Sequence, residues 1–129
     1  MLKLTYTDDG FWLEQLSMTV ETWLQSRLLV SLHAGTALTM EPTTASFLLP
    51  EDLPELATFE ALLWPELGCG VTVAACDAGY VEICLNGTWV GADPEAETGV
   101  FVTRLGDRTE TFLYRLWRQA EAIAELHGD

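Results

Sequence analysis

Basic residues are scarce in this chain. Only 6 of the 129 residues are Lys or Arg, against 20 Asp and Glu, and the formal net charge at pH 7 is −14. Between Leu28 and Thr103 eleven acidic residues occur without a single Lys or Arg. Such a surface repels phosphate groups, which disfavours direct binding to nucleic acid and to anionic membranes. A basic or mixed-charge protein partner is compatible with this charge, although solubility alone is the commoner explanation of an acidic surface.

Cysteine and histidine are also rare. Cys69, Cys76 and Cys84 are separated by six and seven residues, and the two histidines, His33 and His127, are distant in sequence. An odd cysteine count without a secretory signal favours a reducing compartment, and free cysteines are usually small core residues. A zinc site needs closer pairs of ligands. The sequence therefore predicts no metal and no cofactor.

Long apolar runs are absent, so no segment approaches the roughly 20 residues that span a bilayer. The apolar fraction of 49% with 20% charged residues nevertheless argues against disorder. We expect residues 1–129 to form one soluble, cytoplasmic domain.

The stretch from Tyr80 to Val90 contains the strongest turn signal. Asn86-Gly87 favours a two-residue type I′ turn, and the apolar residues before it alternate with more polar ones. The sequence predicts a β-hairpin in which Leu85 lies opposite Thr88, and Cys84 opposite Trp89.

The N-terminal half predicts further strands. A hairpin is expected with strands near 2–7 and 11–16, because Asp8-Asp9-Gly10 supplies turn residues. Residues 17–34 are compatible with one helix, or with a short helix over 19–26 followed by a strand. Thr36 to Met40 and Ser46 to Leu49 then predict two more strands of a small meander.

The second half predicts two helices. Pro54 and the spacing of Leu56 and Phe59 indicate a helix over 54–64, and Val71 to Cys76 indicates a strand. After a strand at 100–102, Asp107 and Glu110 resemble a capping box. The following apolar stripe is Phe112, Leu113, Leu116, Trp117, Ala120, Ile123 and Ala124. The predicted fold is a single α+β domain: a mainly antiparallel sheet of about six strands, with this long amphipathic helix packed on one face.

No phosphate-binding or serine-hydrolase motif is present, and we predict no catalytic residues. Candidate partner-binding residues come from two places. Trp89 precedes an acidic, glycine-flanked loop, which is typical of an interface anchor, although a position at the edge of the core is the preferred explanation. Arg108 and Arg115 lie on one side of the last helix, where internal ion pairs are the alternative. The loop contributes the carboxylates of Asp93, Glu95 and Glu97.

Four segments carry a resemblance to a known group. They are Glu41 to Pro50 (EPTTASFLLP), Asn86 to Val90 (NGTWV), Gly99 to Thr103 (GVFVT) and Thr111 to Trp117 (TFLYRLW). With these segments the chain resembles small, acidic, uncharacterised proteins of cyanobacteria. The resemblance implies a cytoplasmic protein without an assigned catalytic site.

Two classes of function follow. The favoured one is a non-catalytic protein-interaction module, an adaptor, regulator or assembly factor, that binds a basic or mixed-charge protein. The alternative is a small ligand-binding or enzymatic domain with an apolar pocket between sheet and helix. Uncovered sheet area would additionally favour a homodimer.

Overall fold

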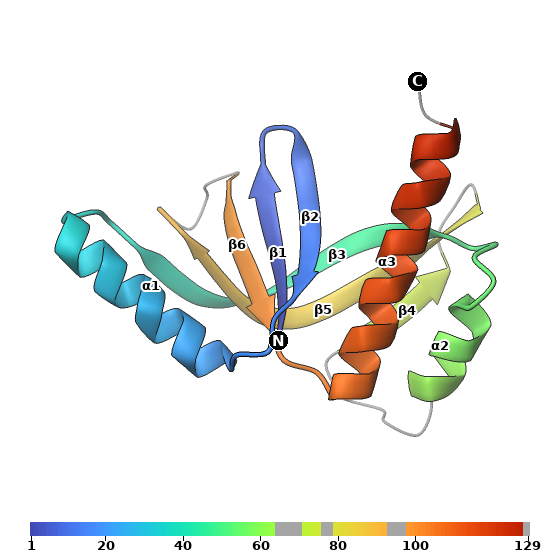
Figure 1. The fold of residues 1–129 in the computed structure, drawn as a ribbon, viewed down its shortest axis with the longest axis horizontal. Helices are drawn as coiled ribbons and strands as arrows, with labels where there is room; N and C mark the ends of the chain where they lie inside the picture. Colours follow the sequence, from blue (N-terminus) through green and yellow to red (C-terminus); the bar gives the residue numbers. More distant parts are fainter. Residues whose placement is uncertain (64–70, 76–78, 93–97, 128–129) are drawn as a thin grey trace. The chain divides into compact units, whose positions relative to one another are not determined.

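The computed structural model describes residues 1–63, 71–75, 79–92 and 98–127 (Figure 1). Its helices are α1 (Val20–Ala34), α2 (Leu56–Leu63) and α3 (Asp107–His127). Its strands are β1 (Leu2–Thr7), β2 (Gly10–Gln15), β3 (Thr39–Pro50), β4 (Val71–Ala75), β5 (Tyr80–Gly91) and β6 (Gly99–Thr103).

The six strands form one sheet in the order β2-β1-β6-β5-β3, and β4 also pairs with β5. The pairings of β1 with β2 and β6, and of β5 with β4 and β6, are antiparallel. The predicted α+β class, with a six-stranded antiparallel sheet and a long C-terminal helix, is thereby confirmed.

The chain divides into two compact units. Unit 1 comprises residues 1–44 and 86–104, and unit 2 comprises residues 45–85 and 105–129. Strands β3 and β5 contribute residues to both units. That residues 1–129 behave as one domain stays a prediction.

The N-terminal hairpin of unit 1 is confirmed to within one residue at each strand end. Leu4 faces Leu13, and both are almost fully buried. Two positions closer to the turn, Tyr6 faces Phe11, and their rings stack with centroids 5.5 Å apart. The alternating apolar residues that predicted these strands therefore do line one buried face.

The predicted hairpin at Asn86-Gly87 is wrong. β5 runs without a turn from Tyr80 to Gly91, and Gly87 does not have a positive φ. Residues 81–85 pair with β4, in which Leu85 faces Val71, and residues 88–90 pair with β6, in which Trp89 faces Phe101. Asn86 and Gly87 thus lie in the strand between the segments that pair with β4 and with β6.

The glycine at position 87 serves close packing and not a turn. A Cβ atom there would come within 2.3 Å of the Val102 carbonyl oxygen and 2.7 Å of Cζ of Phe101. Next to it, the Thr103 hydroxyl donates to the Asn86 carbonyl oxygen at 2.7 Å. Glycine in a strand often marks such a close approach.

In the N-terminal half, one alternative that the sequence left open is decided, and one further prediction is wrong. Of the two alternatives for residues 17–34, the continuous helix is correct, because residues 27–34 are helical. The two strands predicted at 36–40 and 46–49 are one strand, β3, which includes Pro42. β3 ends the strand order of the sheet, where a proline without an N–H group is tolerated.

Unit 2 contains the two remaining helices, and α3 packs beside α2. The predicted stripe is confirmed over the described side chains, because Leu113, Leu116 and Trp117 are buried. Phe112 contributes a ring contact with Phe59 of α2 at 5.8 Å.

The start of α3 differs slightly from the predicted capping box. The first helical backbone bond runs from the Glu110 N–H to the Gly106 carbonyl, and Asp107 is already helical. The buried Glu110 carboxylate reaches back and accepts from the Leu105 N–H at 2.7 Å. Glu110 therefore does reach back to a backbone N–H at the start of the helix, but to that of Leu105, two residues before Asp107, and the prediction of Asp107 as N-cap is wrong.

Candidate functional site

Helix α1 is the most unusual element of unit 1, because it is well capped but poorly buried. The Thr19 hydroxyl accepts from the Thr22 N–H at 3.1 Å, which makes Thr19 the N-cap. At the other end Gly35 has φ 67° and its N–H bonds to the Ser31 carbonyl. The Ser31 hydroxyl also donates to the Thr36 carbonyl at 2.6 Å.

One side of α1 faces the core of unit 1. Trp23 is 4% exposed and belongs to a cluster with Met1, Val90 and Val102, against which Val20 and Leu24 also pack. At 100° per residue, positions 20, 23 and 24 lie on one side of the helix. Arg27 extends this side with its guanidinium 4.9 Å from the centre of the Trp23 ring. The first half of α1 is thus an ordinary core helix.

A second apolar stripe on α1 is exposed. Leu28, Leu29 and Leu32 are 48%, 57% and 69% exposed, and with the exposed Gln25 they have i, i+3, i+4, i+7 spacing. We call Gln25, Leu28, Leu29 and Leu32 the distal seam. Its centre lies roughly 130° around the helix from the core-facing side. This spacing is the one that packs helices against each other.

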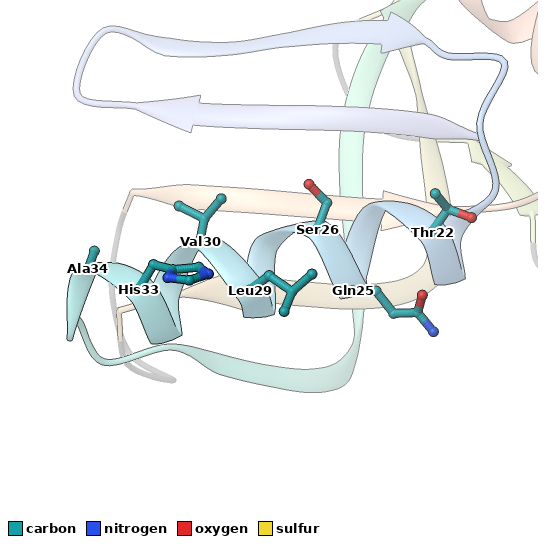
Figure 2. Close-up of a pocket in the computed structure, with 7 residues that line it drawn as sticks. All are labelled: Thr22, Gln25, Ser26, Leu29, Val30, His33 and Ala34. Carbon is teal, nitrogen blue, oxygen red and sulfur yellow. The ribbon is translucent and has the colours of Figure 1, made fainter.

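The surface next to the distal seam is hollowed (Figure 2). The shallow, open depression is lined by residues of α1 alone, among them Gln25, Leu29 and His33. Figure 2 shows Ser26 and Val30 pointing to one side of the helix, with Gln25 and Leu29 on the neighbouring side. Because one helix forms the whole lining, this is not the predicted pocket between sheet and helix, and that pocket stays a prediction.

The distal seam is also uncharged. Besides His33, Glu21 and Arg27 are the only acidic or basic residues of α1, and no Asp, Glu, Lys or Arg occurs from Leu28 to Met40. In a chain of net charge −14, this is a surface that another acidic molecule can approach without repulsion. Aliphatic side chains that are exposed on a helix, and not scattered singly, mark interaction sites.

Trp89, a predicted partner-binding residue, is half-buried in unit 1. Its ring centre lies 5.7 Å from that of Tyr6, and Gly91 and Gly99 leave the space that the indole occupies. Its Nε1–H is buried, and no hydrogen-bond acceptor is found for it among the described residues. Burial raises the pKa of Tyr6. Trp89 therefore completes a row of aromatic rings with Tyr6 and Phe11.

The other predicted partner-binding residues do not form one surface. Asp93, Glu95 and Glu97 lie outside the described residues. Arg108 is exposed at the start of α3. Arg115 pairs internally, with Nε 3.5 Å from the Glu55 carboxylate and the guanidinium 4.8 Å from the Phe112 ring centre. For Arg115 the structure therefore favours the internal ion pair that the sequence left open.

Of the three cysteines, the structure describes Cys84, and Cys69 and Cys76 lie outside the described residues. Its thiol is half-buried and donates to the Glu82 carboxylate at 3.3 Å. Burial, and then the neighbouring Glu82, raise the pKa of Cys84, which keeps the thiol protonated and unreactive. Within the described ranges, no group of three or more His, Cys, Asp or Glu side chains is arranged to hold a metal ion.

Sequence reasoning missed the distal seam. The apolar residues from 28 to 32 looked compatible with a strand, and the helix they belong to has apolar side chains on two sides, so that no single stripe stands out. The detectable signal was the uncharged stretch after Arg27, together with the Gly35 that ends the helix.

A family model matches residues 1–121, which is nearly the whole chain. The chain belongs to the Alr0857-like family. The family takes its name from a gene of the cyanobacterium Nostoc, in agreement with the resemblance to cyanobacterial proteins. No curated protein and no solved structure matches the chain. Over the described part of this Alr0857-like protein, the helices are too short or too polar to span a bilayer.

Proposed function

We propose that this Alr0857-like protein is a non-catalytic interaction module of the cytoplasm that docks protein through the distal seam of α1. The observation that supports the proposal is the exposure of Leu28, Leu29 and Leu32 on a helix whose two ends are firmly capped. A capped helix presents these side chains in a defined geometry, and so it loses little conformational freedom on binding.

The energy available at the distal seam fits a reversible interaction. The three leucines expose the equivalent of nearly two complete side chains, and burying them is worth about 3 to 5 kcal/mol. Association itself costs roughly 4 kcal/mol or more. Contacts from the partner and from neighbouring residues must therefore add to the leucines, because a micromolar affinity corresponds to a net gain of about 8 kcal/mol.

We also propose a basic or mixed-charge protein partner, which would contact the acidic surface and not the distal seam; the net charge of −14 supports this. In unit 2, Glu51, Asp52 and Glu60 are exposed and available to attract such a partner from a distance. The alternative of a ligand-binding or enzymatic domain stays a prediction.

Photo-crosslinking tests the docking surface. A photoreactive amino acid replaces Leu29, and in a matched control it replaces Leu48 on β3, which is 50% exposed. After irradiation in native lysate, mass spectrometry identifies the attached chains. We expect one or a few defined proteins from position 29 and none of them from position 48. Equal or absent crosslinks at the two positions would refute docking through α1.

A further inference from the structure

The distal seam also indicates what kind of partner occupies it. This step rests on the proposed function, because it names the occupant of the same surface. We infer that the occupant is a second copy of this chain, whose α1 packs antiparallel against the first in a two-fold symmetric pair.

Charge is the first reason. Copies of a chain with net charge −14 repel each other over most approach directions. The segment from Leu28 to Met40 has no Asp, Glu, Lys or Arg and one histidine, His33, and it provides a surface on which two copies can meet. A basic partner finds no carboxylate among the four residues of the distal seam, and the exposed Glu21 lies one turn outside them. The absence of acids within the distal seam thus favours an occupant that is acidic over most of its surface but uncharged where it contacts the seam. A second copy of this chain meets both conditions.

Self-complementarity is the second reason. In a two-fold pair, residue i of one chain faces residue j of the other, and j faces i. An antiparallel pair with its axis between positions 28 and 29 places Leu28 opposite Leu29 of the other copy, twice. Gln25 then lies opposite Leu32 of the other copy, also twice. The centre of the contact is four leucines, and its two outer layers each combine an amide with a leucine.

The size of the surface defines the strength of this pair. Four side chains from each copy make a contact at the low end of interface areas, below about 1,200 Å² in total, where complexes are transient. The burial of the leucines of both copies, less the cost of association, corresponds to a dissociation constant between about tens of micromolar and millimolar. Salt should strengthen the pair, because it screens the repulsion between the two acidic bodies. Docking of a basic partner would weaken with salt instead.

Sedimentation equilibrium of the full chain tests this inference. The average mass is measured over a concentration series at low and at high salt. It should rise with concentration from the 14.3 kDa of the monomer towards the mass of a dimer. In high salt this rise should begin at lower protein concentrations. Leu29→Glu should weaken association at least about tenfold, since two carboxylates would be buried at the axis. Leu48→Glu is the matched control, because it adds the same charge at a similarly exposed leucine, and it should leave association unchanged.

A second variant, which should strengthen the dimer, tests the same inference if Leu29→Glu perturbs folding. Gln25→Leu should strengthen the dimer by about three- to tenfold, because it places leucine opposite Leu32 of the other copy. A wild-type chain that stays monomeric at high salt, or a dimer unaffected by Leu29→Glu and Gln25→Leu, would overturn the inference. If a monomeric chain still crosslinks another protein through position 29, the second copy is refuted and the proposed function stands. If both experiments are negative, both fail.

Discussion

Substitution of Gly87 tests whether this glycine is needed for a turn or for close packing of two strands. A Cβ at position 87 would lie 2.3 Å from the Val102 carbonyl oxygen, a backbone atom that cannot rotate away. The Phe101 ring lies 2.7 Å from the same point. Gly87→Ala must therefore shift β6 relative to β5, and overpacking of this kind typically costs 1–3 kcal/mol. Because the obstacle is backbone, we expect a value near the upper limit, about 3 kcal/mol.

The companion substitution is Asn86→Thr. Asn86 is exposed within a continuous strand, where threonine is favoured over asparagine. The Thr103 hydroxyl bonds to the Asn86 backbone carbonyl, so that this contact does not depend on the side chain. Asn86→Thr should change stability by less than about 0.5 kcal/mol, or increase it slightly. In a type I′ turn the same change would be clearly destabilising, since a β-branched residue resists positive φ.

Urea unfolding followed by tryptophan fluorescence measures both variants. Gly87→Ala should lower the unfolding midpoint strongly, by an amount that corresponds to about 3 kcal/mol, while the slope of the transition stays unchanged. Asn86→Thr should have the midpoint of the wild type. A harmless Gly87→Ala, or a Gly87→Ala and Asn86→Thr pair that are equally destabilising, would show that residues 86 and 87 are not in the strand described above.

Two further predictions concern single side chains. Glu110→Ala should destabilise the chain by about 2 kcal/mol, because the buried Leu105 N–H loses its charged acceptor. Glu110→Gln should retain part of that hydrogen bond. Thermal unfolding of both variants measures the two losses of stability, and equal losses would contradict the prediction. Because the pKa of Tyr6 is raised, the Tyr6 phenol keeps its proton to a higher pH in the folded state than in the unfolded state. The stability of the chain should therefore fall as the pH rises above about 10. Tyr6→Phe should make that fall shallower in urea unfolding at alkaline pH, and an identical pH dependence in the variant would disprove the assignment.

Local patterns were sufficient where neighbours in sequence are also neighbours in space. Alternation around Asp8-Asp9-Gly10 predicted β1 and β2, because a short hairpin pairs residues that are close in the chain. The apolar stripe of α3 predicted its buried side for the same reason. The fold class followed from these elements.

The sequence by itself determined the acidic charge, the alternation of β5 and the helical stripe of α3. It did not determine whether the chain reverses at Asn86-Gly87 or continues, because both outcomes need the same alternation before the glycine. Pairing with β6, ten or more residues further along the chain, decided that. In α1, likewise, only the packing of Trp23 on Val90 and Val102 showed which apolar residues are core. It left Val30 and the three leucines of the distal seam exposed.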